Sequence, residues 1–302
     1  MNYQIGVDLG GTKTEVILLS PEHIELYRKR TATPRGTDRE YETIRHVVWH
    51  LIRDAADKIP ESGTYTIGIG IPGALDHDTG LVMNANTTSL IGKPFRADME
   101  NLLGRSVKME NDANCFTLAE SRLGAGKNYR TVFGIIMGTG CGGGLCIDGQ
   151  IHNGRHGIAG EWGHFSVDPQ GNRCYCGNRG CVETKISGSG VEFAFSEKFD
   201  THLGMKDIVE GFRKGEYRCG EIFRQFLDDF GRCIGGLISV LDPDAVIIGG
   251  GLSNIEELYT AGAEKVKRYA FHPNIRTPIL RNELGDSAGV YGAAWIGGQA
   301  EQ

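Results

Sequence analysis

Alternating apolar positions followed by glycines predict two β-hairpins far apart in the chain. In the first, the apolar alternation of residues 5–9 leads into Gly10-Gly11, and residues 16–19 form a second apolar run. In the second, TVFGIIMGTGCGGGLCI at 131–147 places a strand-like segment on each side of its glycines. A period of two is typical of strands with one buried face, and glycine permits a tight turn. Both segments are therefore expected to be hairpins and not strands that feed helices.

Two other segments combine a strand with a sharp turn. Residues 67–71 alternate as IGIGI and end at Pro72-Gly73, which predicts a turn with close backbone approach. Residues 246–248 are an apolar run before Gly249–Gly251, and SNIE at 253–256 has the spacing of a capping box that opens a helix. A strand, a glycine turn and a helix N-terminus together can hold part of a nucleotide through backbone N–H groups.

Each glycine cluster taken alone is most simply a tight turn. Gly138, Gly140 and Gly143 fit the spacing of a dinucleotide-binding loop, but that loop needs a following helix and the pattern predicts another strand. The first cluster lacks the Walker P-loop spacing, although Thr12 and Lys13 lie beside its glycines. Two glycine hairpins about 130 residues apart instead suggest two similar halves that close on a nucleotide.

Composition and charge narrow the classes of function. The chain has 302 residues, of which 40% are hydrophobic and 23% are charged, which suggests a globular protein of about two domains. The formal net charge of −6 argues against nucleic-acid and anionic-membrane partners, since both favour a basic surface. The N-terminal segment has no secretory pattern, and no apolar run approaches the roughly 18 residues of a membrane span. We therefore expect a cytoplasmic protein without membrane or nucleic-acid partners.

Three cysteines within eight positions form a distinctive chemical motif. Cys174, Cys176 and Cys181 follow His164, and together they make a Cys₃His set of the kind that selects tetrahedral zinc. A redox pair and a chance cluster are the alternatives, although a Cys-x-Cys disulfide ring would be small and strained. Four protein ligands leave no open position, so the expected zinc is structural. The isolated cysteines, expected to be small buried thiols, are Cys115, Cys141, Cys146, Cys219 and Cys233.

A carboxylate stands where the chain is expected to start a helix. Asn111, Asp112 and Asn114 directly precede the helical run 115–122. The simplest interpretation is an N-cap, which Asp112 or Asn114 would provide. Transfer of a phosphoryl group to a hydroxyl, however, needs a carboxylate within hydrogen-bond reach to take the proton. Asp112 at the mouth of a cleft between two halves would suit that role.

The glycine and cysteine motifs together resemble a known fold and family. DLGGTK at 8–13, GTGCGGG at 138–144 and IIGGG at 247–251 are similar to the two phosphate loops and the adenosine loop of the actin-like ATPase fold shared by sugar kinases. GEWGH at 160–164 and CYCGNRGCVE at 174–183 resemble the two signature blocks of the ROK family of bacterial sugar kinases and sugar-sensing repressors. The motifs occur in the family's order, so the resemblance covers nearly the whole chain.

The resemblance implies an α/β protein with the two-domain actin-like ATPase (sugar kinase) fold and a cleft between its domains. Residues 1–118 would form the N-terminal domain, joined by a closing helix at about 286–302, and residues 119–285 the C-terminal domain with the zinc loop. The implied activity is transfer of the γ-phosphoryl group of ATP to a hexose hydroxyl, expected at C6, with Mg²⁺ bound to the phosphates. A homodimer is expected, with the helical stretch 219–241 as its face unless that stretch is interior.

The resemblance also implies roles for individual residues. Asp112 would accept the proton of the sugar hydroxyl, Asp8 would orient the metal or its waters, and His164 would offer sugar the ring nitrogen that zinc leaves free. The expected zinc ligands are His164, Cys174, Cys176 and Cys181. The residues expected to bind sugar are Gly73, Asn86, Asn111, Glu161, His164 and Glu183. The residues expected to bind the nucleotide are Asp8, Gly10, Gly11, Thr12, Lys13, Gly138, Thr139, Gly140, Gly249, Gly250 and Gly251.

The choice of sugar rests on less specific features. Residues 33–44 and 83–95, with the zinc loop, look most like the fructokinase and mannokinase branch, so D-fructose or D-mannose is the expected substrate. N-acetylglucosamine kinases share IPG, NDANCF and IIGGGLSN, so N-acetylglucosamine kinase and glucokinase are alternatives. The other classes are a non-catalytic sugar-binding regulator and an ATPase that acts on no sugar. Asp112 favours catalysis, and the position of the first phosphate loop at Asp8 leads us to expect no DNA-binding domain of the ROK repressor kind.

Overall fold

The computed structural model describes residues 2–298, which divide into two compact units. The first unit comprises residues up to 119, residues 153–159 and residues from 287 onward, and the second comprises 120–152 and 160–286. The part of the predicted closing helix at 299–302 lies outside the described residues. Residues 153–159, which the predicted ranges placed in the second domain, pack with the first unit. Each unit is therefore built from segments that are discontinuous in the sequence.

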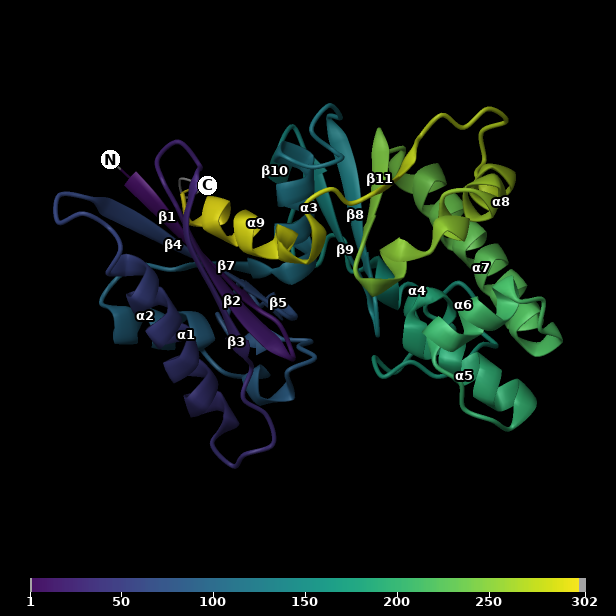
Figure 1. Ribbon diagram of the computed structural model, residues 1–302, viewed down its shortest axis with the longest axis horizontal. Coiled ribbons are helices and arrows are strands. Elements are labelled where there is room, and N and C mark those ends of the chain that lie inside the picture. Colours follow the sequence, from purple (N-terminus) through teal and green to yellow (C-terminus); the bar gives the residue numbers. More distant parts are fainter. Residues whose placement is uncertain (1, 299–302) are drawn as a thin grey trace. The chain divides into compact units, whose positions relative to one another are not determined.

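The first unit is a five-stranded sheet with helices packed against it (Figure 1). Its strands are β1 (Asn2–Leu9), β2 (Lys13–Leu19), β3 (Glu25–Ala32), β4 (Thr64–Ile71) and β7 (Lys108–Asn111), with the small pair β5 (Ala74–Leu75) and β6 (Val82–Met83). Its helices are α1 (Glu40–Ala56), α2 (Phe95–Leu103), the first part of α3 (Asp112–Arg122) and α9 (Ala288–Gly297), with the 3₁₀ turn η1 (Thr88–Leu90).

The second unit also contains a five-stranded sheet, and most of its helices lie between the third and fourth strands in chain order. Its strands are β8 (Thr131–Met137), β9 (Cys141–Ile147), β10 (Gln150–Ile151), β11 (Ala245–Gly249) and β12 (Ile279–Arg281). Its helices are α4 (Val182–Ile186), α5 (Gly188–Phe199), α6 (Met205–Arg213), α7 (Tyr217–Leu241) and α8 (Ala261–Tyr269). The 3₁₀ turns are η2 (Trp162–His164), η3 (Gly251–Asn254), η4 (Glu256–Leu258) and η5 (Gly285–Ser287).

The two sheets have the same topology, which confirms the prediction of two similar halves. The strand orders are β3-β2-β1-β4-β7 and β10-β9-β8-β11-β12. In each sheet an antiparallel hairpin, β1–β2 or β8–β9, is followed by two parallel strands on its other side. Both glycine-rich segments, at 5–19 and 131–147, are therefore hairpins, as their alternation predicts.

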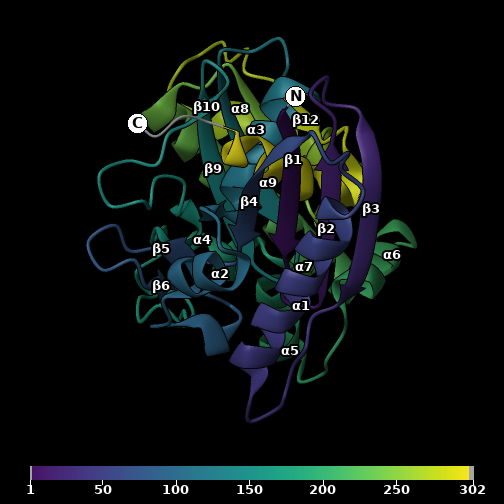
Figure 2. The ribbon, with the colours of Figure 1, turned by 90° about the vertical axis from the view of Figure 1, so that its left-hand side faces the viewer.

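The alternation along β1 and β4 separates the two faces of the first sheet. Ile5 and Val7 are fully buried, together with the isoleucines of β4, in a core that α1 and α2 share. Gly6 and Gly68 point the other way, and a Cβ at either position would overlap the backbone of α9. Figure 2 shows α1 and α9 on opposite sides of these strands. The glycines therefore set how closely α9 can approach the sheet.

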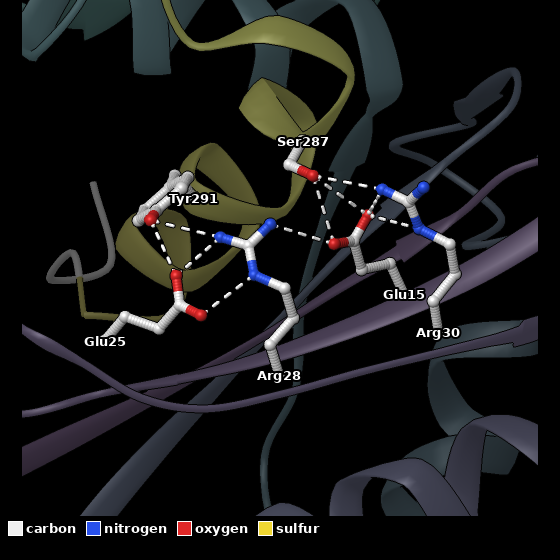
Figure 3. A network of polar contacts seen from close by, with 6 residues as sticks. All are labelled: Glu15, Glu25, Arg28, Arg30, Ser287 and Tyr291. Carbon is white, nitrogen blue, oxygen red and sulfur yellow. Dashed lines mark hydrogen bonds and ion pairs between the residues drawn. The ribbon is translucent and has the colours of Figure 1, made fainter.

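A polar network attaches the start of α9 to the first hairpin (Figure 3). Glu15 on β2 is 2% exposed and accepts hydrogen bonds from Arg28 and Arg30 of β3, at 3.0 and 2.7 Å. It also accepts a bond from the hydroxyl of Ser287 at 3.1 Å, and Arg28 donates to the hydroxyl of Tyr291 on α9 at 3.1 Å. Because a buried carboxylate is costly unless paired, these contacts favour one position of α9 against β2 and β3.

Helix α7 runs through the core of the second unit. Phe223, Phe226 and Phe230 on its inner face are at most 1% exposed and pack with side chains of β8 and β11. This face of the stretch 219–241 is interior, which was the alternative to a dimer face, and a homodimer stays a prediction. The five isolated cysteines are all buried, as predicted for small structural thiols.

Three helix starts differ from their predictions. The prediction that SNIE at 253–256 opens a helix is wrong, because η3 and η4 occupy this segment and α8 begins only at Ala261. Ser253 is 4% exposed and its N–H donates to Gly250 O within the first of these turns, so the chain turns again before a helix can form. Helix α3 begins three residues earlier than predicted, at Asp112, and α9 begins at Ala288 after the turn η5.

Candidate active site

The first predicted phosphate loop is the turn between β1 and β2. The N–H of Gly10 donates to Lys13 O at 3.0 Å, which closes the turn. The hydroxyl of Thr33, just after β3, donates to Gly10 O at 2.7 Å, and the N–H of Thr33 donates to Thr12 O at 3.0 Å. The loop is therefore held in one shape by the segment that follows β3.

Asp8 lies at the end of β1, on the face that α9 covers. A Cβ at Gly289 would lie 2.8 Å from Oδ2 of Asp8, so the carboxylate sits against the first turn of α9. Burial, together with the negative charge of Glu15, raises the pKa of Asp8 to about 6, and the positive charges of Lys13 and Arg30 partly oppose this. A cation beside such a carboxylate favours its ionised form, which suits a group that would orient a metal ion or its waters.

Asn111 organises the start of α3, where Asp112 is the first residue. Its side-chain N–H donates to Gly73 O at 2.9 Å, and its Oδ1 accepts the N–H of Ala113 at 2.9 Å. Asn111 therefore caps α3, a role that the simplest interpretation gave to Asp112 or Asn114. Asp112 Oδ1 accepts the same Ala113 N–H at 2.8 Å, which fixes the direction of its carboxylate.

The turn at Gly73 brings a further predicted residue toward this point. Gly73 has a φ of +95°, and a Cβ there would lie 2.8 Å from Cα of Ala85, the neighbour of Asn86. The close backbone approach predicted for Pro72-Gly73 is confirmed. The first unit thus brings together Gly73, Asn86, Asn111 and Asp112, four of the residues predicted to act on the sugar.

The second predicted phosphate loop, at 138–140, is held by the start of α5. Its carbonyls accept hydrogen bonds from the N–H of Gly188 at 2.8 Å and from the hydroxyl of Ser189 at 2.6 Å. Just after β11, the strand that pairs with β8, Gly250 has a φ of +79°, and a Cβ there would overlap the carbonyl of the last residue of β8. The loops 138–140 and 249–251 therefore lie side by side at the carboxyl ends of parallel strands, where α/β sheets bind ligands.

Glu183 links the second phosphate loop to the cysteine cluster. Its Oε2 accepts the N–H of Cys141 at 2.9 Å, and a Cβ at Gly140 would lie 2.6 Å from the same oxygen. Burial raises the pKa of Glu161, while the charge of His164 lowers it and that of Glu183 raises it. The three groups predicted to bind sugar in the second unit are therefore close enough to act on one another electrostatically.

The four predicted zinc ligands converge. Their ligand atoms all lie within 4.8 Å of one another. His164 Nδ1 is 3.5 Å from Cys174 Sγ, and Cys176 Sγ is 3.7 Å from Cys181 Sγ. A tetrahedral zinc with ordinary bond lengths needs about 3.6 Å between a nitrogen and a sulfur and about 3.8 Å between two sulfurs. Within the described residues, this Cys₃His group therefore fits a closed tetrahedral zinc site.

The second ring nitrogen of His164, which is predicted to face the sugar, contacts a protein side chain. Nε2 lies 2.9 Å from the hydroxyl of Tyr175, and the two rings meet edge to face at 5.0 Å. A sugar hydroxyl could reach this nitrogen only by displacing or sharing the Tyr175 hydroxyl. Tyr175 was not among the predicted site residues, and its position between Cys174 and Cys176 is the one signal in the sequence that could have indicated it.

Two sheets of one topology, each with a glycine loop at its hairpin, define the two-domain actin-like ATPase fold of sugar kinases. The sequence matches the ROK family over residues 4–300, and the chain belongs to this family. The N-acetyl-D-glucosamine kinase of Yersinia pseudotuberculosis is 36% identical over 301 residues, which cover 96% of this chain and 97% of that relative.

Two solved structures extend the comparison. The ROK hexokinase of Thermus thermophilus has a TM-score of 0.84 at 30% identity, and covers 98% of this chain and 97% of its own. The ROK glucokinase of Streptomyces griseus, solved with glucose and AMPPNP, has a TM-score of 0.81 at 29% identity, and covers 99% of this chain and 100% of its own. No helix within residues 2–298 is both long and apolar enough to cross a membrane.

Proposed function

We propose that this protein is an ATP-dependent hexose kinase that phosphorylates D-fructose or D-mannose, with C6 as the site of transfer. The observation that carries this proposal is the placement of Asp112. Its carboxylate stands at the start of α3, directed by the N–H of Ala113 and placed beside the Gly73 turn through Asn111. The sugar kinases among the relatives support the same class of reaction.

In the proposed reaction Asp112 is the general base. The C6 hydroxyl oxygen forms a bond to the γ-phosphorus as the bond between that phosphorus and the ADP oxygen breaks, and the hydroxyl proton passes to the Asp112 carboxylate. Mg²⁺ bound with ATP would neutralise charge on the phosphates. Asp8 would hold this ion or its waters, and the loops at 10–13 and 138–140 would bind the phosphates through backbone N–H groups.

The remaining predicted residues would bind the sugar, the zinc ion or the adenosine. Gly73, Asn86 and Asn111 would bind sugar hydroxyls from the first unit, and Glu161, Glu183 and His164 from the second. A zinc ion on the Cys₃His group would fix the loop between Glu161 and Glu183 without taking part in the chemistry, since its four protein ligands leave no open position. The loop 249–251 would take the adenosine.

The sequence motifs and the known relatives point to different sugars. The segments 33–44 and 83–95 and the motif CYCGNRGC look like the fructokinase and mannokinase branch. The N-acetylglucosamine kinases are the alternative, which a 36% identical relative favours.

Steady-state kinetics tests both levels of the proposal. Purified protein is mixed with MgATP and, separately, with fructose, mannose, glucose and N-acetylglucosamine, and ADP formation is followed. ADP formation that depends on a sugar supports the kinase, and the highest kcat/KM on fructose or mannose supports the branch. A highest kcat/KM on N-acetylglucosamine would replace the sugar and keep the reaction. Sugar binding without ADP formation would indicate the non-catalytic regulator instead.

A further inference from the structure

The segment that follows β3 is clamped against the first phosphate loop and carries an arginine there. Thr33 makes two hydrogen bonds to this loop, to Gly10 O and Thr12 O, and its hydroxyl also lies 2.9 Å from that of Thr14. Arg35 stands two residues further on. Its backbone is therefore placed by contacts with the loop itself.

The Arg35 guanidinium lies directly against Gly11. A Cβ at Gly11 would come 2.6 Å from Nη2 of Arg35, so the guanidinium occupies the space that a side chain at Gly11 would fill. In the part of the chain from 2 to 298, Arg35 makes no hydrogen bond or ion pair. The Glu40 carboxylate accepts hydrogen bonds from the N–H of Gly36 at 2.7 Å and from the hydroxyl of Ser89 at 2.9 Å. The positive charge of Arg35 helps these bonds to lower the pKa of Glu40, but the side chains of Arg35 and Glu40 do not pair.

A buried hydroxyl without a partner faces the same point. Thr87 is 4% exposed, and its Oγ1 is buried and lacks a hydrogen-bond partner among the described residues. This oxygen is 3.9 Å from the position of a Cβ at Gly11. A buried hydroxyl left unpaired costs stability, so its retention points to a partner that the protein chain does not supply.

We infer that Arg35 and Thr87 bind the phosphoryl group that is transferred, beside the Gly10-Gly11 turn. The inference rests on the proposed kinase reaction and deepens it. A guanidinium presents parallel N–H donors that match two phosphate oxygens, and a threonine hydroxyl adds a third donor. As the bond from phosphorus to the ADP oxygen breaks and the bond to the sugar oxygen forms, Arg35 stabilises the negative charge on the equatorial oxygens. Asp112 takes the hydroxyl proton in the same step.

The inference predicts that replacing Arg35 changes nucleotide binding differently from replacing a neighbouring residue. A residue that binds the γ-phosphoryl group should matter for ATP and not for ADP, whereas a residue that only supports the loop should affect both nucleotides alike. Arg39 provides a matched control, since it is an exposed arginine four residues further along the same segment. Glutamine at either position removes one positive charge and keeps a hydrogen-bonding side chain.

The experiment compares R35Q, R35K, T87V and R39Q with the wild type by calorimetry with MgATP and MgADP and by kcat. We expect R35Q to weaken ATP binding about 10-fold while ADP binding changes less than about 2-fold, and to lower kcat about 10- to 100-fold. R35K should recover part of kcat because it restores the charge without the paired donors. R39Q should match the wild type.

T87V supplies a second readout that does not depend on the arginine. Removing an unpaired buried hydroxyl should leave the melting temperature unchanged or higher, yet lower kcat. Equal losses of ATP and ADP affinity in R35Q, or a fully active T87V, would overturn the inference. If R35Q fails to fold, R35K and T87V still decide it. If wild-type protein phosphorylates no sugar, the proposed function fails, while the comparison of ATP with ADP still tests Arg35.

Discussion

Replacing Cys176 by serine tests whether the Cys₃His group is a structural zinc site. The distances of 3.5 and 3.7 Å between its ligand atoms match a tetrahedral ion, so the wild-type protein should contain one zinc per chain. Structural zinc binding is worth about 10–16 kcal/mol, or roughly 3 kcal/mol for each of four ligands. Loss of one thiolate should therefore weaken zinc binding about 100-fold or more.

The same change should lower stability and sugar binding together. Zinc closes the chain between His164 and Cys181, and freeing a loop of about 15 residues costs roughly 3 kcal/mol. At about 2–4 °C for each kcal/mol, the melting temperature should fall by roughly 6–12 °C. Because this loop lies between Glu161 and Glu183, the KM for sugar should rise much more than the KM for ATP.

Elemental analysis, zinc competition with a chromogenic chelator and thermal melts measure these effects. Cys219→Ser is the control for the loss of a thiol, because Cys219, a buried cysteine, lies outside the group, and this variant should keep one zinc per chain. The reasoning is refuted if Cys176→Ser holds zinc as tightly as the wild type, or if stripping zinc leaves the melting temperature unchanged. Loss of activity on addition of a reductant, with no zinc present, would instead indicate a redox disulfide.

Three further substitutions test the base, a charged contact and a packing contact. Asp112→Asn should lower kcat at least about 100-fold with little change in sugar affinity, and retention of more than a tenth of kcat would contradict the assignment. The hydrogen bond from Lys265 lowers the pKa of Asp228 to about 2. Asp228→Asn should therefore lower the free energy of unfolding at pH 7 by about 2 kcal/mol. This contribution is present above about pH 4 and is lost as the pH falls through 2, and denaturant titrations at each pH measure it. Gly68→Ala should cost about 3 kcal/mol or more in denaturant unfolding because its methyl meets the α9 backbone, whereas Gly236→Ala, in open space on α7, should be neutral or stabilising.

Local patterns were sufficient where an element is determined by its own neighbours in the sequence. The two hairpins follow from alternation over a few residues and a glycine turn, and the cysteine cluster follows from ligand spacing within one loop. The capping box at 253–256 failed because its spacing alone does not exclude 3₁₀ turns. Ser253 is buried beneath such a turn, a consequence of packing that no short motif contains.

The site residues that the prediction missed are those brought together by tertiary structure. Arg35 and Thr87 are more than 20 residues from Gly11, and only the folding of two loops over the hairpin brings them to it. Tyr175 lies within a recognised motif, but its contact with the second nitrogen of His164 depends on how the cysteine loop folds. The sequence predicted the residues of each motif better than the contacts between motifs.

The packing of α9 on β1 and β4 has a consequence for how the chain is made. The strands that form this surface are complete by residue 71, whereas α9 begins at residue 288. At about 5–20 residues per second, a ribosome needs roughly 10–45 s to reach the helix after it has finished the strands. During that interval the face of the sheet that carries Gly6, Asp8 and Gly68 lacks the helix that covers it in the folded protein, so this face cannot complete its packing until α9 has been synthesised.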